Sequence, residues 1–248
     1  MFSEKDAFQE IKKFSPNFVI NCAGKTGRPN VDWCEDHKKE TLDSNVFLPL
    51  NLAKACEKTG SNLVHIGSGC VYEGDNNGIG FSETDPPNFY GSFYSITKLL
   101  SEELLKEHNP LQLRIRMPID TEMGPRNFIT KISTYKKVIN IQNSMTIIED
   151  MLEATEILMK KKKTGIYNIV NPGTISHKEI LQMYTQLINP NHKYETISLE
   201  ELHSFTKAKR SNCVLNSKKI ESEIKLPNIK TQIEKILKTN QNKKNQTP

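Results

Sequence analysis

Several features that often define a protein class are absent from this sequence. The five cysteines include no Cys-x-x-Cys pair, and the six histidines show no metal-ligand spacing, so no metal site is expected. The odd number of cysteines and the lack of a secretory signal favour free thiols in a reducing compartment. No apolar run approaches the roughly 18 residues that a membrane span needs. We therefore expect a soluble, cytoplasmic protein.

Charge of one sign does not dominate either. The formal net charge is +5, and the lysines are spread through the helical stretches without interleaved aromatics. This pattern argues against a nucleic-acid surface and fits a weakly basic pocket for a phosphorylated small molecule. With 248 residues and 36% hydrophobic content, the chain is long enough for one large α/β domain, or a domain and a small lobe.

Strand and helix patterns alternate over the first 120 residues. Strands are predicted at 17–24 ("NFVINCAG"), 61–72 ("SNLVHIGSGCVY") and 111–119 ("LQLRIRMPI"), and helices at 5–16, 34–60 and 92–108. Pro49 marks an expected kink in the long second helix. This alternation is typical of a Rossmann-like parallel sheet flanked by helices, in which the polar strand ends meet at one ligand-binding edge.

The alternation loosens beyond residue 120. Helices are predicted at 126–138, 146–163 and 176–188, with one strand at 164–173. We interpret residues 1–120 as the dinucleotide-binding domain and 121–236 as a small, mostly helical substrate lobe interleaved with the sheet. The polar tail, 237–248, has no periodicity and is expected to be disordered.

A tyrosine and a lysine one helical turn apart, Tyr94 and Lys98, are candidates for proton delivery. Alone, a Tyr-x-x-x-Lys match is close to chance in a lysine-rich chain with seven tyrosines. Ser68, at the end of the strand before this helix, changes the interpretation. A serine can polarise a ketone, and an ammonium group can tune a phenol that protonates the alkoxide left by hydride addition. The three residues together indicate a ketoreductase site.

The sequence resembles the extended short-chain dehydrogenase/reductase superfamily through "NCAG", "IGSGCVY" and "YSITK" in this order. More narrowly, "GKTGRPNVDWCEDHK", "GIGFSETDPPNFYGSFYSITK", "RNFITKIS" and "NPGTISHKEIL" are similar to the bifunctional nucleotide-4-keto-6-deoxyglucose 3,5-epimerase/4-reductases of rhamnose synthesis. The resemblance implies NADP or NAD as cofactor and UDP- or dTDP-4-keto-6-deoxyglucose as substrate. It also leaves a homodimer open.

The resemblance assigns roles to individual positions. It gives the reductase triad as Ser68, Tyr94 and Lys98, with Lys98 also on the nicotinamide ribose. The remaining cofactor contacts that it implies are Ala23, Gly24, Lys25, Asn45, Met117 and Pro118. The substrate contacts that it implies are Arg28, Asn30, Cys70, Asn127 and Arg210. Ordinary surface or capping polarity is the alternative interpretation of Arg28, Asn30, Asn127 and Arg210.

The resemblance also assigns the epimerase chemistry to Cys70 and Lys131. Protons at C3 and C5 flank the 4-keto group, so their removal gives a stabilised enolate, and inversion needs a base on one face and an acid on the other. The alternative interpretation of Cys70 is a small buried apolar residue, and that of Lys131 is a solvent-exposed helix lysine.

The family's first β-α-β element, with its glycine-rich phosphate loop, has no counterpart in the sequence. No G-x-G-x-x-G follows a strand anywhere in the chain. We expect a shortened form of a normal enzyme, since the downstream catalytic positions are intact. The alternatives are a non-catalytic, reductase-like regulatory subunit and another nucleotide-sugar epimerase or dehydratase. The sequence does not separate UDP from dTDP, or NADPH from NADH.

Overall fold

The computed structural model describes residues 2–246, and the side chains of residues 2–243. The strands are β1 (Phe18–Asn21), β2 (Asn62–Ser68), β3 (Leu111–Ile115), β4 (Lys137–Ile139), β5 (Gly165–Asn168) and β6 (Glu195–Ile197). The helices are α1 (Glu4–Phe14), α2 (Asp32–Asp36), α3 (Lys38–Leu42), the π-helical segment η1 (Asp43–Phe47), α4 (Leu48–Thr59), α5 (Phe93–Lys106), α6 (Phe128–Ile132), α7 (Ile148–Lys160), α8 (His177–Leu187), α9 (Leu199–Ser204), α10 (Lys218–Glu221) and α11 (Ile229–Gln246).

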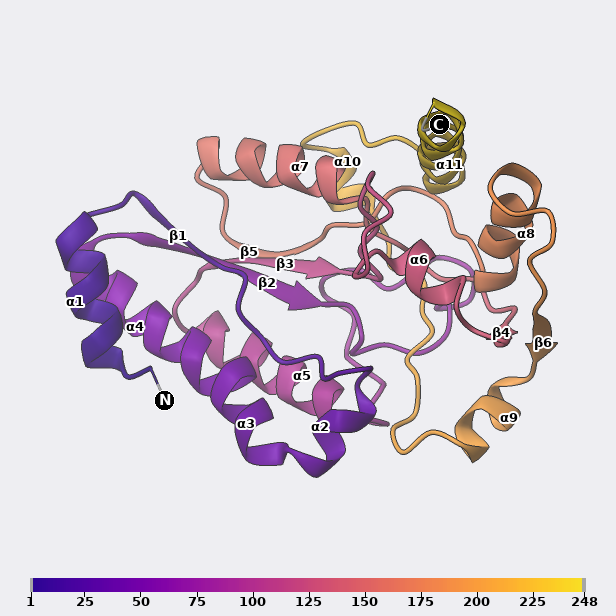
Figure 1. Cartoon of the computed structure of the whole chain (residues 1–248). Helices are drawn as coiled ribbons and strands as arrows, with labels where there is room; N and C mark the ends of the chain where they lie inside the picture. The colour runs from indigo at the N-terminus through magenta and orange to yellow at the C-terminus, as the bar shows by residue number, and fades with distance from the viewer. Residues whose placement is uncertain (1, 247–248) are drawn as a thin grey trace.

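The central sheet is parallel and has the order β1-β2-β3-β5 (Figure 1). Its register places Ile20, Val64, Leu111 and Gly165 in one row across the four strands. The central strands are short apolar runs, as expected where helices cover both faces of a parallel sheet. The predicted α/β fold with a parallel sheet flanked by helices is confirmed.

Two helical layers enclose the sheet. One layer contains α1, α4 and α5, whose apolar residues pack with Leu63 of β2, and α7 covers the other face through Ala154 and Leu158 (Figure 1). α1 begins at a capping box formed by Ser3 and Asp6. Because β2 and β3 are parallel, their carboxyl ends meet at one edge of the sheet, beside α6.

The segment 34–60 is not the single kinked helix that its sequence predicts. The helix is interrupted at His37, whose φ and ψ of −121° and 50° are not helical. It then passes through η1, where the Leu48 amide donates to the carbonyl of Asp43 five residues earlier. Pro49, at the start of α4, has no amide hydrogen to donate to the preceding turn, which fits a wider hydrogen-bond pattern here. The irregularity therefore precedes Pro49.

The lobe beside the sheet edge contains β4, β6, α6, α8, α9 and α11 (Figure 1). Its core joins residues of α6, α8 and α11, including Ile129, Ile180 and Ile233. The helix predicted over 126–138 is only the short α6, because Val138 and Ile139 belong to β4, which pairs in parallel with β6. The chain after residue 120 also adds β5 and α7 to the central sheet, so lobe and sheet are interleaved.

The C-terminal tail differs from its prediction. Residues 237–246 belong to α11, whereas a disordered segment was expected from residue 237. The apolar positions Ile233, Ile236 and Leu237 are buried and anchor this helix on the lobe. Lysine and glutamine are adequate helix formers, so the polar sequence continues the helix that this packing starts. Residues 247–248 of the predicted tail lie outside the described residues.

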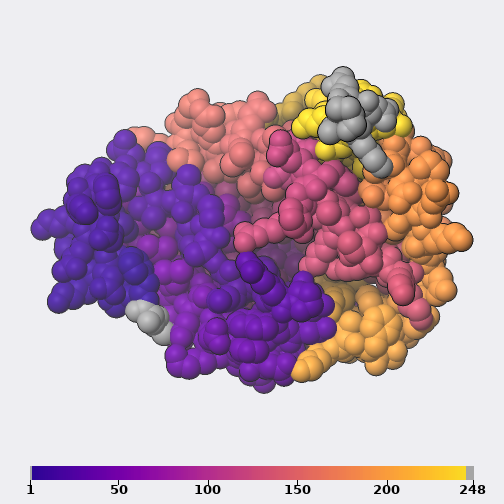
Figure 2. Space-filling model, viewed as in Figure 1, coloured from indigo at the N-terminus to yellow at the C-terminus, as the bar shows by residue number. Residues whose placement is uncertain are grey.

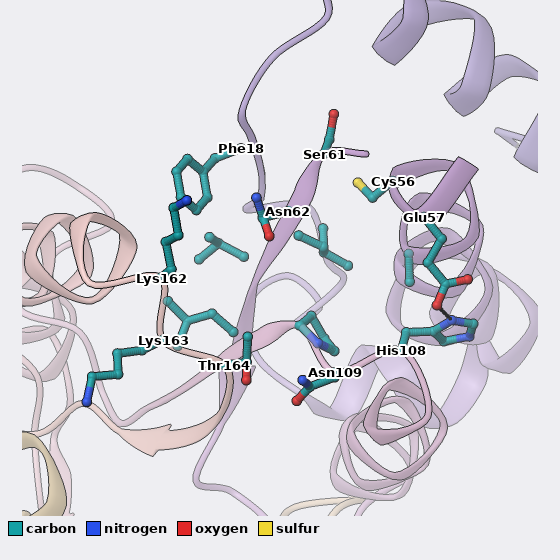
Figure 3. A pocket seen from close by; sticks show the side chains of 15 residues that line it. Phe18, Cys56, Glu57, Ser61, Asn62, His108, Asn109, Lys162, Lys163 and Thr164 are labelled. Atoms are coloured by element: carbon teal, nitrogen blue, oxygen red, sulfur yellow. Dashed lines mark hydrogen bonds and ion pairs between the residues drawn. The ribbon is translucent and has the colours of Figure 1, made fainter. Parts of the chain in front are cut away.

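A small cavity of about 80 Å³ lies at the amino ends of the strands (Figure 3). Phe18, Asn62 and His108 are among the residues that line it, and His108 contacts Glu57 at 2.7 Å. This is the edge opposite the carboxyl ends of β2 and β3, so the cavity is separate from the predicted site. Over residues 2–246, no helix is long and apolar enough to cross a bilayer.

Candidate active site

Ser68 and Cys70 lie at the carboxyl end of β2, where Tyr94 of α5 approaches them. The Cys70 amide donates to the Ser68 hydroxyl at 3.1 Å. Burial raises the pKa of the Tyr94 phenol and the nearby Cys70 adds to this effect, while the Ser68 hydroxyl opposes it. Tyr94 therefore lies near both Ser68 and Cys70. The raised pKa keeps the Tyr94 phenol protonated, which is the form that a proton donor needs.

Lys98 is buried beneath this group. Its ammonium donates to the carbonyl of Ile66 at 2.9 Å and approaches Nε2 of His65 at 3.4 Å. Burial lowers the pKa of Lys98 to about 8, although the charge of Glu102 works in the opposite direction. The structure shows no direct hydrogen bond between the side chains of Lys98 and Tyr94 among the described residues. Lys98 can therefore act on the phenol only through its charge or through a bound ligand.

His65 was not expected in this site. It is 1% exposed, and its Nδ1 lies 3.0 Å from Nδ2 of Asn21, whose Oδ1 accepts from the Ala23 amide at 3.0 Å. Burial and the neighbouring Lys98 hold the pKa of His65 well below its ordinary value, so the ring is neutral and its Nδ1 accepts from Asn21. A histidine inside the apolar run "LVHIG" was the available signal in the sequence.

Asn45 fixes the turn that follows β1. Its side chain accepts from the Lys25 amide at 2.7 Å, and donates to the Lys25 carbonyl at 3.0 Å and to the Thr97 hydroxyl at 3.1 Å. Asn45 belongs to η1, so the π-helical geometry brings this side chain to the turn. The turn residues Ala23, Gly24 and Lys25 are exposed, and their backbone is open to a ligand. The predicted role of Asn45 in supporting this backbone agrees with these contacts.

Arg116, just beyond β3, is a further residue of the site that the sequence analysis did not name. One guanidinium nitrogen donates to the Cys70 sulfur at 2.8 Å, and the other donates to Asn143 Oδ1 at 2.6 Å and to the Ser211 carbonyl at 3.1 Å. Arg116 is 1% exposed. The spacing of Arg114 and Arg116 in an otherwise apolar run was the signal that could have identified it.

Lys131 and Asn127 lie on α6, on the lobe side of the site. Lys131 donates to the Pro29 carbonyl at 2.9 Å, and burial, followed by the charge of Arg210, lowers its pKa. No described hydrogen bond or ion pair joins Lys131 to Cys70. Asn127 caps α6 by accepting from the Ile129 amide, and it donates to two carbonyls of the preceding loop. Its amide is therefore occupied by the local chain, which favours the capping interpretation.

The other predicted substrate contacts are distributed around the loop after β1. Arg28 is exposed, and Asn30 accepts from the Asp32 amide at 2.8 Å. Arg210 forms a two-point ion pair with Asp32 at 2.8 and 3.0 Å. This pairing engages much of the guanidinium that was expected to face a diphosphate. Together with the Lys131–Pro29 contact, it ties the loop after β1 to the lobe.

Met117 and Pro118 follow β3 at the same edge. Met117 has φ of 40°, in the left-handed region that few residues other than glycine adopt. Backbone strain of this kind is concentrated at binding sites. Pro118 is exposed. Their contact with the nicotinamide stays a prediction. The space-filling view shows a hollow between the indigo-violet N-terminal part and the rose part of the chain (Figure 2).

Comparison with known proteins identifies the family. Residues 3–242 match the profile of the family described as RmlD substrate binding domain. The chain belongs to this family. The bifunctional dTDP-4-dehydrorhamnose 3,5-epimerase/dTDP-4-dehydrorhamnose reductase of Arabidopsis thaliana is 48% identical to this chain over 221 residues, covering 86% of this chain and 73% of that protein. The sequence-based recognition is thereby confirmed.

Two further relatives define the extent of the match. The trifunctional UDP-glucose 4,6-dehydratase/UDP-4-keto-6-deoxy-D-glucose 3,5-epimerase/UDP-4-keto-L-rhamnose-reductase of Arabidopsis thaliana is 48% identical over 222 residues. This chain spans 33% of that protein's length. The crystal structure of the L780 UDP-rhamnose synthase from Acanthamoeba polyphaga mimivirus superimposes with a TM-score of 0.89 at 38% identity, covering 95% of this chain and 86% of that chain.

The residues of this RmlD-family chain fit one end of a nicotinamide dinucleotide. The exposed turn at Ala23–Lys25 and the buried ammonium of Lys98 suit the nicotinamide ribose. The sequence contains no glycine-rich loop to cradle the diphosphate. The dTDP-4-dehydrorhamnose reductase of Bacillus anthracis, solved in complex with NADP, shares the fold with a TM-score of 0.79 at 22% identity. Within the described residues, no group of three or more His, Cys, Asp or Glu side chains is placed to hold a metal.

Proposed function

We propose that this chain catalyses NAD(P)H-dependent 3,5-epimerisation and 4-keto reduction of UDP- or dTDP-4-keto-6-deoxyglucose, which yields a nucleotide-L-rhamnose. The observation that carries the proposal is the grouping of Ser68, Cys70 and Tyr94 above the buried Lys98. Both plant relatives at 48% identity have epimerase and reductase activities in their names. The 4,6-dehydratase activity named for the longer relative is not proposed for this chain.

The reduction uses the protonated phenol of Tyr94. When bound beside Lys98, a nicotinamide would supply the hydride that C4 of the sugar receives. Ser68 polarises the ketone by donating a hydrogen bond to O4, and Tyr94 delivers its proton to O4 as charge develops there. The ammonium of Lys98 stabilises the resulting phenolate electrostatically, and its contact with the Ile66 carbonyl holds it beneath the site.

The epimerisation uses the sulfur of Cys70. A thiolate removes the proton beside the ketone, and the electron pair moves into an enolate that Ser68 and Tyr94 stabilise through O4. A proton then returns from the opposite face. Lys131, with its lowered pKa, is the proposed donor on the lobe side. Supporting this role, Lys131 borders the loop after β1 through its contact with Pro29.

The experiment supplies purified protein with UDP- or dTDP-4-keto-6-deoxyglucose and NADPH, and follows cofactor oxidation and the sugar product. Tyr94→Phe should lower the reduction rate by about 10²- to 10⁴-fold, because the phenolic proton donor is lost. The exposed Tyr90, whose hydroxyl contacts only the Pro87 carbonyl among its described hydrogen bonds, provides the matched control Tyr90→Phe. Absence of both cofactor oxidation and a rhamnose product would overturn the proposal.

One rival is a non-catalytic binding subunit built on the same scaffold. Stable capture of an enzyme partner, combined with no turnover, would support this rival against the proposal.

All five cysteines are unpaired in the structure, which supports the proposed reducing, cytoplasmic setting. A homodimer remains a prediction from the resemblance.

A further inference from the structure

Arg116 is a buried cation with no carboxylate partner in the part of the chain that the structure describes. Its hydrogen-bond acceptors are the Cys70 sulfur, Asn143, and the hydroxyl and carbonyl of Ser211. Arg114, two residues earlier, shows the usual alternative, because it pairs with Glu102 through two contacts of 2.7 Å. A buried charge is costly unless an anion compensates it. The environment of Arg116 therefore lacks an anion that Arg114 possesses.

The contacts of Arg116 hold its guanidinium in one orientation. One guanidinium nitrogen donates a hydrogen bond to Oδ1 of Asn143, which is itself 0% exposed, at 2.6 Å. The same nitrogen donates to the Ser211 carbonyl at 3.1 Å. Gly69 leaves the space for the arginine stem, since a Cβ there would lie 2.8 Å from Arg116 Cδ. The second nitrogen is thereby aimed at the Cys70 sulfur, at 2.8 Å.

Cys70 is the sulfur best placed to supply the missing negative charge. Cys213 is also near Arg116, but it is buried and its thiol donates to the Gly69 carbonyl at 3.3 Å. Cys70 is half-buried, lies beside Ser68 and Tyr94, and faces the site rather than the core. Despite burial, the sulfurs of Cys213 and Cys70 hold the pKa of Arg116 above its ordinary value, so the guanidinium keeps its charge.

We propose that Arg116 is a positioning residue that orients the Cys70 sulfur and carries the counter-charge of its thiolate during epimerisation. This inference rests on the proposed function. In each proton transfer the sugar C–H bond breaks, an S–H bond forms at Cys70, and the electron pair moves into the enolate. Arg116 retains all of its protons, and the guanidinium then loses its anionic partner for the lifetime of the enolate. Lys131 then delivers a proton to the opposite face, and proton exchange with solvent recharges Lys131 and returns Cys70 to the thiolate beside Arg116.

The first test measures thiol reactivity and needs no substrate. Iodoacetamide is added at neutral pH, and alkylation of Cys70 is followed by peptide mass spectrometry, with the exposed Cys22 as internal reference. Because the thiolate is the reacting form, Cys70 should react about tenfold faster than Cys22 in the wild type, although it is less exposed. Arg116→Gln should remove this advantage, and Arg116→Lys, which keeps a charge, should retain most of it. A slower reaction of Cys70 than of Cys22 in the wild type would overturn the proposal, even if Arg116→Gln does not fold.

The second test separates the two chemical steps. Epimerisation is measured without cofactor as deuterium incorporation from solvent at C3 and C5, and reduction is measured with the already epimerised 4-keto sugar and NADPH. Arg116→Gln should lower deuterium incorporation by about 100-fold and reduction by less than about tenfold, since only the first step needs the thiolate. In a Cys70→Ser background, Arg116→Lys should have no further effect on deuterium incorporation.

The outcomes distinguish this inference from the proposed function. Equal losses of both steps in Arg116→Gln would show a purely structural role and overturn the inference. A wild-type protein that performs neither step, but whose Cys70 reacts rapidly in an Arg116-dependent manner, would overturn the proposed function and leave the pairing of the two side chains standing. Rapid epimerisation in Arg116→Gln would overturn the inference alone.

Discussion

Replacing Lys98 by methionine should change how the stability of the fold depends on pH. Burial lowers the pKa of Lys98 from 10.5 to about 8, so the folded state holds this proton less tightly than the unfolded chain does. Below pH 8 both states are protonated, and the folded state bears the full cost of the buried charge. Between pH 8 and 10.5 the unfolded chain binds more protons, so stability rises with pH.

The magnitude follows from the difference between the two pKa values. Since each pKa unit corresponds to about 1.4 kcal/mol, the charged Lys98 costs the folded protein about 3 kcal/mol at neutral pH. Most of this cost disappears by pH 10, so the wild type should gain about 2 kcal/mol relative to Lys98→Met between pH 7 and pH 10. The hydrogen bond to the Ile66 carbonyl is lost at every pH in the variant, so comparing the two pH values cancels much of that contribution.

Urea denaturation followed by far-ultraviolet circular dichroism, at several values between pH 7 and pH 10, measures this difference. The free energy of unfolding of Lys98→Met is subtracted from that of the wild type at each pH. A difference that rises with pH supports the argument that a residue kept for catalysis is held at the expense of stability. A difference that stays constant within about 0.5 kcal/mol, or that falls with pH, would refute the claim that burial destabilises the charged form of Lys98.

Three further predictions concern the supports of the site. Glu102→Gln should lower the free energy of unfolding by about 3–5 kcal/mol, because Arg114 would be left as an unpaired buried charge. Asn45→Ala should cost about 1–3 kcal/mol and raise the KM for the cofactor, because the turn after β1 loses both hydrogen bonds that this side chain makes with Lys25. Gly69→Ala should destabilise by about 1–3 kcal/mol, since its Cβ would lie 2.6 Å from a neighbouring side-chain carbon, whereas Gly124→Ala meets nothing within 4 Å and provides the control.

Each of these predictions has its own measurement and contrary result. Urea denaturation tests the first and third, and a loss below about 1 kcal/mol in Glu102→Gln would contradict the buried ion pair. Cofactor titration followed by tryptophan fluorescence tests the second, because Trp33 lies next to Lys25. Unchanged cofactor affinity in Asn45→Ala would show that the turn does not contact the cofactor. Equal stability losses at Gly69 and Gly124 would contradict the close packing at the end of β2.

The central sheet could be predicted because its strands are continuous apolar runs between clear helical periods. "LVHIG" and "LQLRI" lie in β2 and β3, and "SITKLLSEELL" lies in α5, as their patterns indicate. The lobe could not be predicted equally well. Its strands β4 and β6 have three residues each, too few to show a period of two, and α6 has only five. These short elements depend on contacts between distant segments.

The structure brings together some of the predicted site residues and not others. Ser68, Cys70 and Tyr94 come together as expected at the end of β2. Arg116 and His65 were missed because a polar residue within an apolar run carries no local sign of what it will face. Their partners lie 46 and 33 residues away along the chain, at Cys70 and Lys98. Only the packed structure brings such partners together.

The π-helical segment η1 makes the helix that follows β1 sensitive to chain length. A π-helical turn holds one residue more than an α-helical turn, so deleting a single residue from 43–47 would restore a regular helix and redirect the side chains of that turn. Asn45 or its replacement would then point away from the turn at Lys25, although α4 could still cover the sheet. A deletion this small, in a segment without any catalytic side chain, would then inactivate the site while leaving the protein folded.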